Sequence, residues 1–506
     1  MVVLAAQIAI GQANWSDDVA EIVYENCTAC HRNGGIAPFS MMSYESAAEY
    51  ASVIDDVILT NYMPPWSPDP DYQSYAHERL LDEAEKIALI EWANTGALPG
   101  NLDNAPPPPV YPSDGYIAQV PDVEVQIEEY TSQATPTSDD YVCFSMPLNL
   151  TEAKKLRAFE VIPGNPDIVH HCLLYIDESG TYPSDFSGTC VGPTEGLIGG
   201  YTPGAVPTVF PSNGDDVNMG VTIPAGSNIV LAMHYPEGSL GETDQTKVRL
   251  FFYDDAVQIR EIQTEPIIQN WEFMLPAHEI TDVSANWNLI PQDVSMLSIF
   301  PHMHLLGKYI ECYGVTLDGD TLSMINIPHW DFEWQQFYAF ENMITVPAWT
   351  DVIAQGSFDN TANNPHNPNT PPITVWPGLN TADEMFIVYF QFLPYEDGDE
   401  LLPLEELTTM PTSVNELNWS ASPISCFPNP MNESCEFSFE STSPSMLSLY
   451  IYDSNGRLIS KVADREQIGT GSHNYRWTAD PGLAPGIYHY STRLGGEVFI
   501  GKILKR

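Results

Sequence analysis

Residues 296–307 read MLSIFPHMHLLG. The apolar run Met296–Phe300 predicts a buried strand that ends in a turn at Pro301. Residues i and i+2 of a strand point to the same face, so we expect His302 and His304 to direct both imidazoles toward one metal ion. The alternative is a pair of ordinary histidines in a loop, because His-x-His alone does not select a metal.

The composition predicts several β-rich domains. A chain of 506 residues is too long for a single core, and a hydrophobic fraction of 43% with an aromatic fraction of 11% indicates a globular protein. The 43 prolines and the scarcity of long periodic runs favour β-sandwiches over helix bundles.

The charge balance excludes two classes of partner. The formal net charge is -50, with 18 Lys and Arg against 68 Asp and Glu, and such a field repels nucleic acid and anionic lipid. High solubility or a salty habitat explains this charge without any specific partner. No later apolar run is long enough to cross a membrane, so no transmembrane segment is expected.

Two features point to export. Residues 1–13 resemble the remnant of a secretory signal peptide, in which small residues follow an apolar run. Six of the eight cysteines are scattered through β-like segments, which suggests disulfides and an oxidising compartment. These six are Cys143, Cys172, Cys190, Cys312, Cys426 and Cys435.

Residues 14–104 contain the pattern of a haem module. Ser16 is expected to cap a helix over residues 17–24, and this helix leads into Cys27-Thr28-Ala29-Cys30-His31. Cys-x-x-Cys-His is the attachment signature of c-type haem: the two thiols form thioethers, and the following His reaches the iron. The alternative is a redox dithiol with an incidental histidine.

The second axial ligand is expected from Met63, which is followed by Pro64, Pro65 and Trp66. Met/His ligation suits electron transfer, whereas the alternative for a lone Met is core packing. A second helix is expected over residues 82–94. The set resembles a small class I cytochrome c and the cytochrome modules fused ahead of copper monooxygenase-like domains in bacteria. A stiff Pro-rich linker, residues 105–112, ends the module.

Between residues 113 and 400, short β-like runs alternate with Gly, Pro and Asn turns, which predicts antiparallel sandwiches. Three runs carry candidate ligands: residues 169–176 contain His170 and His171, residues 229–236 contain His234, and residues 385–393 begin with Met385. Adjacent strand residues point to opposite faces, so His170 and His171 share a metal only if the strand bends between them.

This order of His-His, strand-end His, His-x-His and Met resembles the copper type II, ascorbate-dependent monooxygenases, the family of peptidylglycine α-hydroxylating monooxygenase and dopamine β-monooxygenase. The resemblance covers roughly residues 120–395. It implies two consecutive β-sandwich domains, over residues 113–265 and 266–400, each carrying one copper ion and facing the other across a solvent-filled cleft.

The resemblance also assigns two sets of copper ligands. The set that stores and passes electrons consists of His170, His171 and His234. The set at which dioxygen and substrate meet consists of His302, His304 and Met385. Imidazole and thioether ligands suit copper that cycles between +1 and +2, and a thioether favours Cu(I).

Residues 385–392 are expected to alternate between two strand faces, with Met385, Ile387, Tyr389 and Gln391 on one and Phe386, Val388, Phe390 and Phe392 on the other. Tyr389 shares the strand face of Met385 and matches a family tyrosine near the substrate, the alternative being a half-buried sandwich tyrosine. A disulfide between Cys143 and Cys190 is implied by the resemblance alone.

The chain also departs from the family pattern. Phe300 stands where peptide-processing members have an arginine for a substrate carboxylate, and Ala232 stands where they have a glutamine. These differences argue against a glycine-extended peptide as the substrate.

After a linker over residues 401–424, residues 425–506 resemble the C-terminal sorting domain of type IX secretion cargo. The resemblance rests on Pro428-Asn429-Pro430, Asp453-x-x-Gly456-Arg457, Pro485-Gly486-Ile487-Tyr488 and a basic terminus. The alternative is a small β-sandwich binding module. Cys426 and Cys435 are placed to join the first hairpin of this domain.

The fold expected from these patterns is multidomain: a small α-helical cytochrome c, two antiparallel β-sandwich copper domains, and a small C-terminal β-sandwich. The expected function is a secreted or cell-surface monooxygenase, exported through the periplasm, with two copper ions and one covalent haem c. It would hydroxylate a C–H bond of a small molecule or peptide with dioxygen, using electrons from an external donor through the haem. Two alternatives stay open: an electron-transfer or copper-binding protein that hydroxylates nothing, and a surface interaction protein with degenerate sites.

Overall fold

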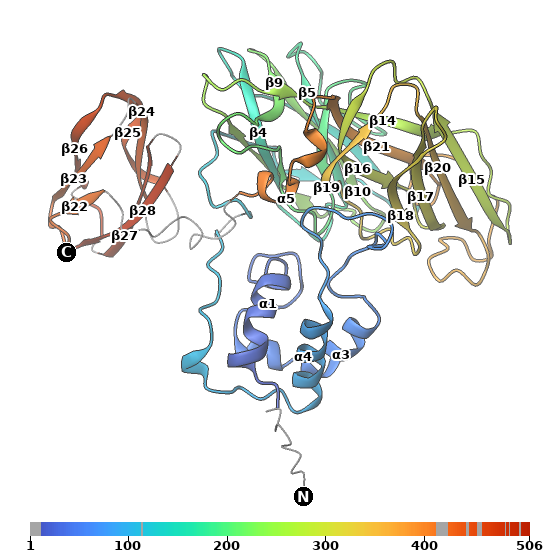
Figure 1. Cartoon of the computed structure of the whole chain (residues 1–506), viewed down its shortest axis with the longest axis horizontal. Coiled ribbons are helices and arrows are strands. Elements are labelled where there is room, and N and C mark those ends of the chain that lie inside the picture. The colour runs from blue at the N-terminus through green and yellow to red at the C-terminus, as the bar shows by residue number, and fades with distance from the viewer. Residues whose placement is uncertain are drawn as a thin grey trace, which may run out of the picture. The chain divides into compact units, whose positions relative to one another are not determined.

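The computed structural model describes residues 12–112, 115–410, 424–441, 445–452, 458–480, 482–484, 486–494 and 497–506. Most of the expected signal-peptide remnant, residues 1–11, lies outside this range. The chain divides into two compact units, drawn in Figure 1. Unit 1 contains Met1–Pro108 and Pro121–Thr409, and unit 2 contains Pro109–Val120 and Met410–Arg506.

The N-terminal part of unit 1 is helical. A π-helical turn, Trp15–Val19, runs into α1 (Ala20–Asn26), and α2 (Tyr44–Ala48), α3 (Ala51–Leu59), α4 (Glu83–Asn94) and a 3-10 turn (Leu102–Asn104) follow. The expected Ser16 cap is wrong: the side chain of Asn14 accepts from the N–H of Asp17, and Ser16 is buried. In α4, Asp82 caps the helix together with Glu85, and the buried residues are Leu89 and Trp92.

The first sandwich of unit 1 consists of two mainly antiparallel sheets (Figure 1). One sheet has the order β1 (Val123–Gln126), β12 (Lys247–Phe252), β4 (Lys154–Ile162), β9 (Met219–Ile223) and β13 (Arg260–Glu261), with β8 (Thr208–Val209) beside β4. The other has the order β6 (Asp185–Gly188), β3 (Asp140–Pro147), β10 (Asn228–Tyr235), β5 (His171–Asp177) and β7 (Leu197–Tyr201). A small ribbon pairs β2 (Tyr130–Thr131) with β11 (Thr243–Asp244).

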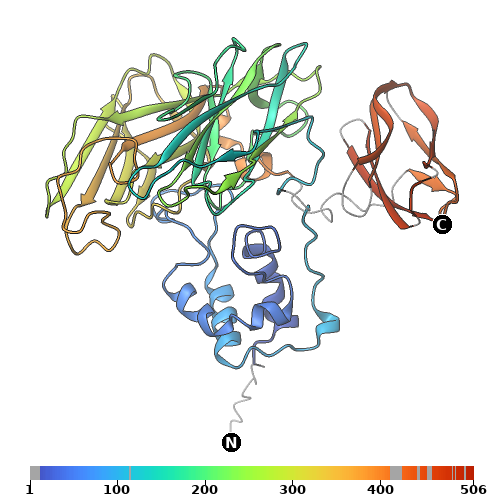
Figure 2. The same cartoon turned by 180° about the vertical axis from the view of Figure 1, so that it is seen from behind.

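The second sandwich contains two four-stranded sheets, which Figure 2 shows from behind. One has the order β14 (Gln263–Asn270), β21 (Phe386–Pro394), β16 (Val294–His302) and β19 (Tyr338–Val346). The other has the order β15 (Ile280–Trp287), β20 (Asp351–Asp359), β17 (Gly307–Val315) and β18 (Thr321–Ile327). A 3-10 turn (Asp399–Leu401) and α5 (Leu404–Leu407) complete the unit.

The second sandwich has a core of its own, but the core of the first sandwich extends onto it. Leu297, Met343 and Leu393 of the second sandwich and Leu404 of α5 belong to the same buried cluster as the core of the first sandwich. Because this burial removes apolar surface of both sandwiches from water, it holds the sheet that contains β5 and β10 against the sheet that contains β16 and β21.

Residues 64–81, which we call the connecting segment, lie along the second sandwich. The Tyr75 hydroxyl donates to the Met324 carbonyl at 2.8 Å, and the Ala76 N–H donates to the Ala339 carbonyl at 2.9 Å. The ring centroids of Trp66 and Tyr338 are 5.3 Å apart in an edge-to-face arrangement. The chain that follows the expected haem motif is therefore part of the β-rich body.

Unit 2 contains two sheets. The first has the order β22 (Ser425–Phe427), β23 (Ser434–Ser441) and β26 (Gly471–Thr478); the second has the order β25 (Leu458–Ile468), β24 (Ser445–Tyr452), β27 (Gly486–Leu494) and β28 (Glu497–Lys505). Their shared core contains Phe437, Leu449 and Ile503.

The expectation of a mostly β chain with several sandwich-like parts is therefore confirmed. Residues 453–457 and Pro485, which carry part of the sorting-domain pattern, lie outside the described residues. None of the helices in the described part of the chain is long and apolar enough to cross a membrane.

We predict that Tyr75→Phe lowers the free energy of unfolding of unit 1 by about 1–3 kcal/mol, because the buried Met324 carbonyl loses its donor. The exposed Tyr62→Phe serves as the control and is expected to stay within about 0.5 kcal/mol of wild type. Urea unfolding followed by tryptophan fluorescence measures both. Equal losses in the two variants would contradict this account of the connecting segment.

Candidate metal centre

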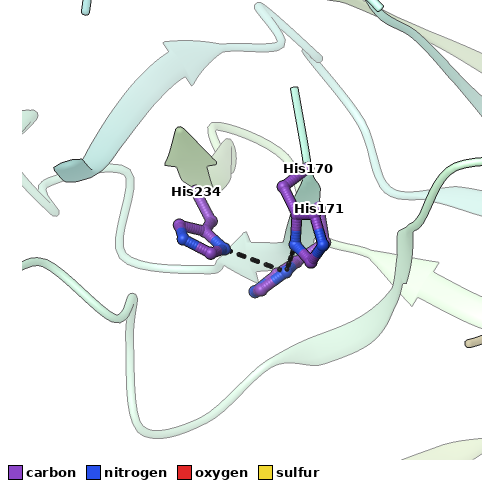
Figure 3. Close-up of side chains that lie close together, drawn as sticks. All are labelled: His170, His171 and His234. Carbon is purple, nitrogen blue, oxygen red and sulfur yellow. Dashed lines mark hydrogen bonds between the residues drawn. The ribbon is translucent and has the colours of Figure 1, made fainter. Parts of the chain in front are cut away.

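Three histidines of the first sandwich converge in one cluster (Figure 3). His234 of β10 lies directly opposite His171 of β5 in the antiparallel register. The His171 Nδ1 atom is 3.0 Å from His170 Nδ1 and 3.2 Å from His234 Nδ1. Two nitrogen ligands about 2.0–2.1 Å from one metal ion lie about 3 Å apart, so these residues fit a shared metal.

His170 joins the cluster because it lies outside the strand. β5 begins at His171, and the His170 N–H donates to the His234 carbonyl at 3.1 Å just before the strand starts. The two adjacent histidines therefore need not obey the alternation of a regular strand. The position of His170 before the strand therefore takes the place of the bend that sharing a metal would otherwise require.

Burial keeps the imidazoles of His170 and His171 neutral. Desolvation, with smaller contributions from the neighbouring histidines, lowers the pKa of His170 to about 3 and holds the pKa of His171 well below its usual value. A metal binds the neutral form of imidazole, so these two histidines need no deprotonation to accept an ion at pH 7.

Asp139 lies on the other side of the His234 ring. Its Oδ2 atom is 3.2 Å from His234 Nε2, although that nitrogen makes no well-aligned hydrogen bond. The carboxylate accepts from the N–H groups of Thr381, at 2.6 Å, and Glu237, at 2.8 Å. Burial alone would raise the pKa of Asp139, but His234 and Thr381 hold it well below its usual range. Asp139 thus orients a candidate ligand and fixes the loop that precedes Met385.

The second sandwich contributes His302, the last residue of β16, and His304, two residues later. Their ring centroids are 5.1 Å apart. His302 Nδ1 lies 2.7 Å from the side-chain oxygen of Gln335, and His304 Nδ1 lies 3.2 Å from the Asp383 carbonyl. These acceptors hold the proton on Nδ1 and leave each Nε2 as the metal-binding atom. Burial lowers the pKa of His302 to about 4.

Glu384 ties Met385 to the turn that carries these histidines. Its fully buried carboxyl group accepts from the N–H groups of His304 at 2.9 Å, Leu306 at 2.6 Å and Met385 at 3.2 Å. Burial raises its pKa to about 8, against the opposing effect of these hydrogen bonds. Glu384, Asp139 and Gln335 were not among the site residues predicted from the sequence. The acidic pair Asp383-Glu384 directly before Met385 was the available signal for the first of them.

The two histidine sets adjoin each other. The ring centroids of His171 and His302 are 6.0 Å apart, and Phe332 stacks on His170 at 4.6 Å and meets His304 edge-on at 5.7 Å. At this point rings, and not an open solvent-filled cleft, separate the two sets. The cleft implied by the family resemblance is replaced here by ring contacts beside a cavity.

A cavity of about 480 Å³ borders His171 and the second set. The alternation expected for residues 385–392 is confirmed: Met385, Ile387, Tyr389 and Gln391 line the cavity, whereas Phe386, Val388 and Phe390 belong to the core. Phe300 lies opposite Tyr389 in the β16–β21 register, with ring centroids 5.6 Å apart and an angle of 22° between the rings. Burial raises the pKa of Tyr389 to about 12, and its hydroxyl makes no hydrogen bond to any described residue.

The haem-motif residues lie on one turn after α1. The N–H groups of Cys30 and His31 both donate to the Cys27 carbonyl, and both thiols are free. His31 Nδ1 is 3.3 Å from the Phe39 carbonyl, which leaves its Nε2 as the atom for an iron. The residues present therefore fit a c-type haem on this side. The ligation by Met63, which follows α3, stays a prediction.

Of the remaining six cysteines, two form a disulfide and four are free thiols. The disulfide between Cys143 and Cys190 is present, with Cα atoms 5.8 Å apart. Cys172, Cys312, Cys426 and Cys435 are free thiols, so the first hairpin of unit 2 is not covalently joined in this structure.

Comparisons with known proteins do not assign the chain to a family. No protein-family model matches the chain, and no curated protein does. Among solved structures, an FMN-binding β-glucuronidase from Facaelibacterium prausnitzii L2-6 is similar with a TM-score of 0.14 and 12% identity, over 45% of this chain and 33% of that one. The VP2 subviral particle of infectious bursal disease virus gives a TM-score of 0.14 and 10% identity, over 60% of this chain and 87% of that one. Oxalate decarboxylase from Bacillus subtilis gives a TM-score of 0.14 and 10% identity, over 56% of this chain and 79% of that one. Similarities this low carry no argument about fold or function.

We predict that the metal-free protein takes up two equivalents of copper. His171→Ala removes one equivalent, because it deletes the central nitrogen of the first cluster, and Met385→Ala weakens the other at least 10-fold. Elemental analysis after desalting measures the copper content. The exposed His329→Ala is the control and should retain both equivalents. Full copper content in both site variants would refute the ligand assignment.

Proposed function

We propose that the chain is a copper-dependent monooxygenase that hydroxylates an activated C–H bond with dioxygen. One observation carries the proposal: five imidazoles lie in two adjoining sets, and His171, His302 and His304, together with the thioether of Met385, border a single cavity large enough for an organic substrate. A structural role would not require so many histidines whose rings lie this close together and are held by specific partners.

The chain's residues have distinct parts in this proposal. His170, His171 and His234 would hold one copper ion through Nδ1, and His302, His304 and Met385 would hold the other through Nε2 and sulfur. The bound copper would supply one-electron redox chemistry and activate dioxygen. Gln335 and the Asp383 carbonyl keep the second pair of rings in the required tautomer.

The wall beside the second set would position the substrate. Phe300 and Tyr389 present a stacked aromatic pair to the cavity, and the unpartnered Tyr389 hydroxyl offers one hydrogen bond to a bound molecule. Burial of the surrounding side chains excludes water, which limits uncoupled reduction of dioxygen.

A haem would supply one-electron transfer. Cys27 and Cys30 would hold the haem through thioethers, and His31 and Met63 would bind its iron. Fusion through a short connection raises the effective concentration of an electron carrier to about millimolar. An external donor would reduce the haem. Fusion for joint export alone remains the alternative.

Unit 2 would direct the protein to the type IX secretion machinery and so to the cell surface or the medium. The proposal rests on the sequence resemblance, together with the small sandwich of β22 to β28. A β-sandwich without a site carries no function by itself.

The second candidate function is electron transfer without hydroxylation. The departures at Phe300 and Ala232 favour it, because both replace polar groups of the peptide-processing members by apolar ones. This second function would use the same copper and haem sites as the monooxygenase, but no oxygen atom would be transferred to an organic product.

An isotope experiment separates these two functions. We predict that copper-loaded protein supplied with ascorbate, ¹⁸O₂ and a mixture of small organic compounds yields products that gain one ¹⁸O atom, detected by mass spectrometry. His302→Ala should lower this yield at least 100-fold, and His329→Ala should not change it. Consumption of dioxygen by the wild type without ¹⁸O in any organic product would favour the electron-transfer alternative.

We further predict that protein from a host that attaches haem carries one covalent haem with a low-spin Met/His spectrum. Met63→Ala should remove the sulfur-to-iron charge-transfer band of the oxidised protein while covalent attachment persists, because Cys27 and Cys30 are unchanged. The matched control is Met42→Ala. An intact band in Met63→Ala would show that another residue is the axial ligand.

A further inference from the structure

The cavity beside His302 has a cationic group in its wall. Among the residues that line it, Arg79 of the connecting segment is the only Arg or Lys. Arg79 is half-buried, so its guanidinium is partly removed from water. The group therefore differs from an ordinary solvated surface charge.

Arg79 has no acidic partner. Its Nη2 atom donates to the Gly204 carbonyl at 3.0 Å and to the side-chain oxygen of Gln336 at 2.5 Å, and it forms no ion pair with any described residue. A guanidinium has five N–H donors, so the Nε–H and both Nη1–H groups remain available. In a chain with 68 Asp and Glu and 18 Lys and Arg, an arginine that lies beside a cavity and has no acidic partner indicates a binding site for an external anion.

The available donors lie close to the second histidine set. Gln336 contacts Arg79, and the preceding residue, Gln335, contacts His302. The Cα atoms of consecutive residues are about 3.8 Å apart, so one short loop connects the cation to a candidate ligand. Both glutamines line the cavity together with Arg79 and His302, so one wall of the cavity joins the cation to the second histidine set.

The rest of the cavity has a different character. Phe300, Ile387 and Tyr389 provide an apolar and aromatic surface next to Met385. Glu195 and Glu265 lie among the lining residues and are exposed, and they would repel a second negative charge. A volume of about 480 Å³ falls within the usual range for organic ligands.

We infer that the cavity binds a molecule with an apolar body and a single carboxylate, with the carboxylate accepting from the Nη1–H groups of Arg79 and the body against Phe300 and Tyr389. A hydrogen bond from a guanidinium to a carboxylate is charge-assisted and therefore stronger than one to a neutral acceptor. The inference rests on the proposed function only in naming this molecule as the substrate, since the binding itself requires no metal.

The test uses the full chain, metal-free and copper-loaded, and isothermal titration calorimetry. The probes are the ω-phenyl carboxylates from phenylacetate to 6-phenylhexanoate and their primary amides, which have nearly the same shape without the charge. The wild type should bind the best carboxylate about 10- to 100-fold more tightly than its amide. Equal affinities for acid and amide at every chain length would overturn the inference.

Three variants locate the interaction. Arg79→Met should abolish the preference for the acid, Arg79→Lys should retain part of it, and Phe300→Ala should weaken acid and amide equally. Lys86→Met removes one positive charge elsewhere in the N-terminal part and should leave the preference unchanged. A preference that persists in Arg79→Met, with wild-type thermal stability, would place the anion elsewhere and refute the assignment.

The preference for the acid does not depend on whether the protein binds copper. Failure of the protein to bind copper would refute the proposed function while the acid preference of metal-free protein still stands. Conversely, transfer of ¹⁸O to neutral compounds only, with no acid preference, would retain the monooxygenase and refute the anion subsite.

Discussion

The candidate metal centre depends on the antiparallel pairing of β5 with β10. In this register His171 and His234 are direct cross-strand neighbours, and such neighbours present side chains to the same face at short distance. The pairing of β10 with β3 places Tyr141 opposite His234, and the two rings stack at 4.3 Å with an angle of 5°. A slip of one residue in either pairing would turn His234 to the other face and would separate the three Nδ1 atoms.

Desolvation determines the chemistry of these residues. Burial is the largest cause of the lowered pKa of His170, His171, His302 and His304, so all four are neutral donors at physiological pH. The same burial raises the pKa of Glu384, whose carboxyl group nonetheless stays in place because three backbone N–H groups point at it. Backbone donors thus hold the thioether loop to the histidine turn, and the metal ligands need not provide that connection themselves.

The ligand histidines could be predicted because each lies in or next to a strand whose period-2 pattern is visible in the sequence. The alternation of residues 385–391 is the clearest case, since it separates cavity residues from core residues as expected. The supporting residues could not be predicted in this way. Glu384 contacts His304 across 80 residues, and Arg79 contacts Gln336 across 257, so neither contact leaves a periodic signal in the local sequence. The position of the N-terminal cap also escaped prediction, because Asn14 and Ser16 are both good capping residues and only the path of the chain decides between them.

The position of the connecting segment has a consequence for the order of folding. Tyr75 docks on Met324, 249 residues further along the chain. At about 5–20 residues per second, the ribosome needs roughly 12–50 s to produce the surface on which Tyr75 docks. During that time Trp66 and Tyr75 have been synthesised, but β18 and β19, which cover them, do not yet exist. The connecting segment is therefore synthesised early but reaches its final contacts late. Its docking is a non-local step in folding, and contacts between residues far apart in the sequence form slowly.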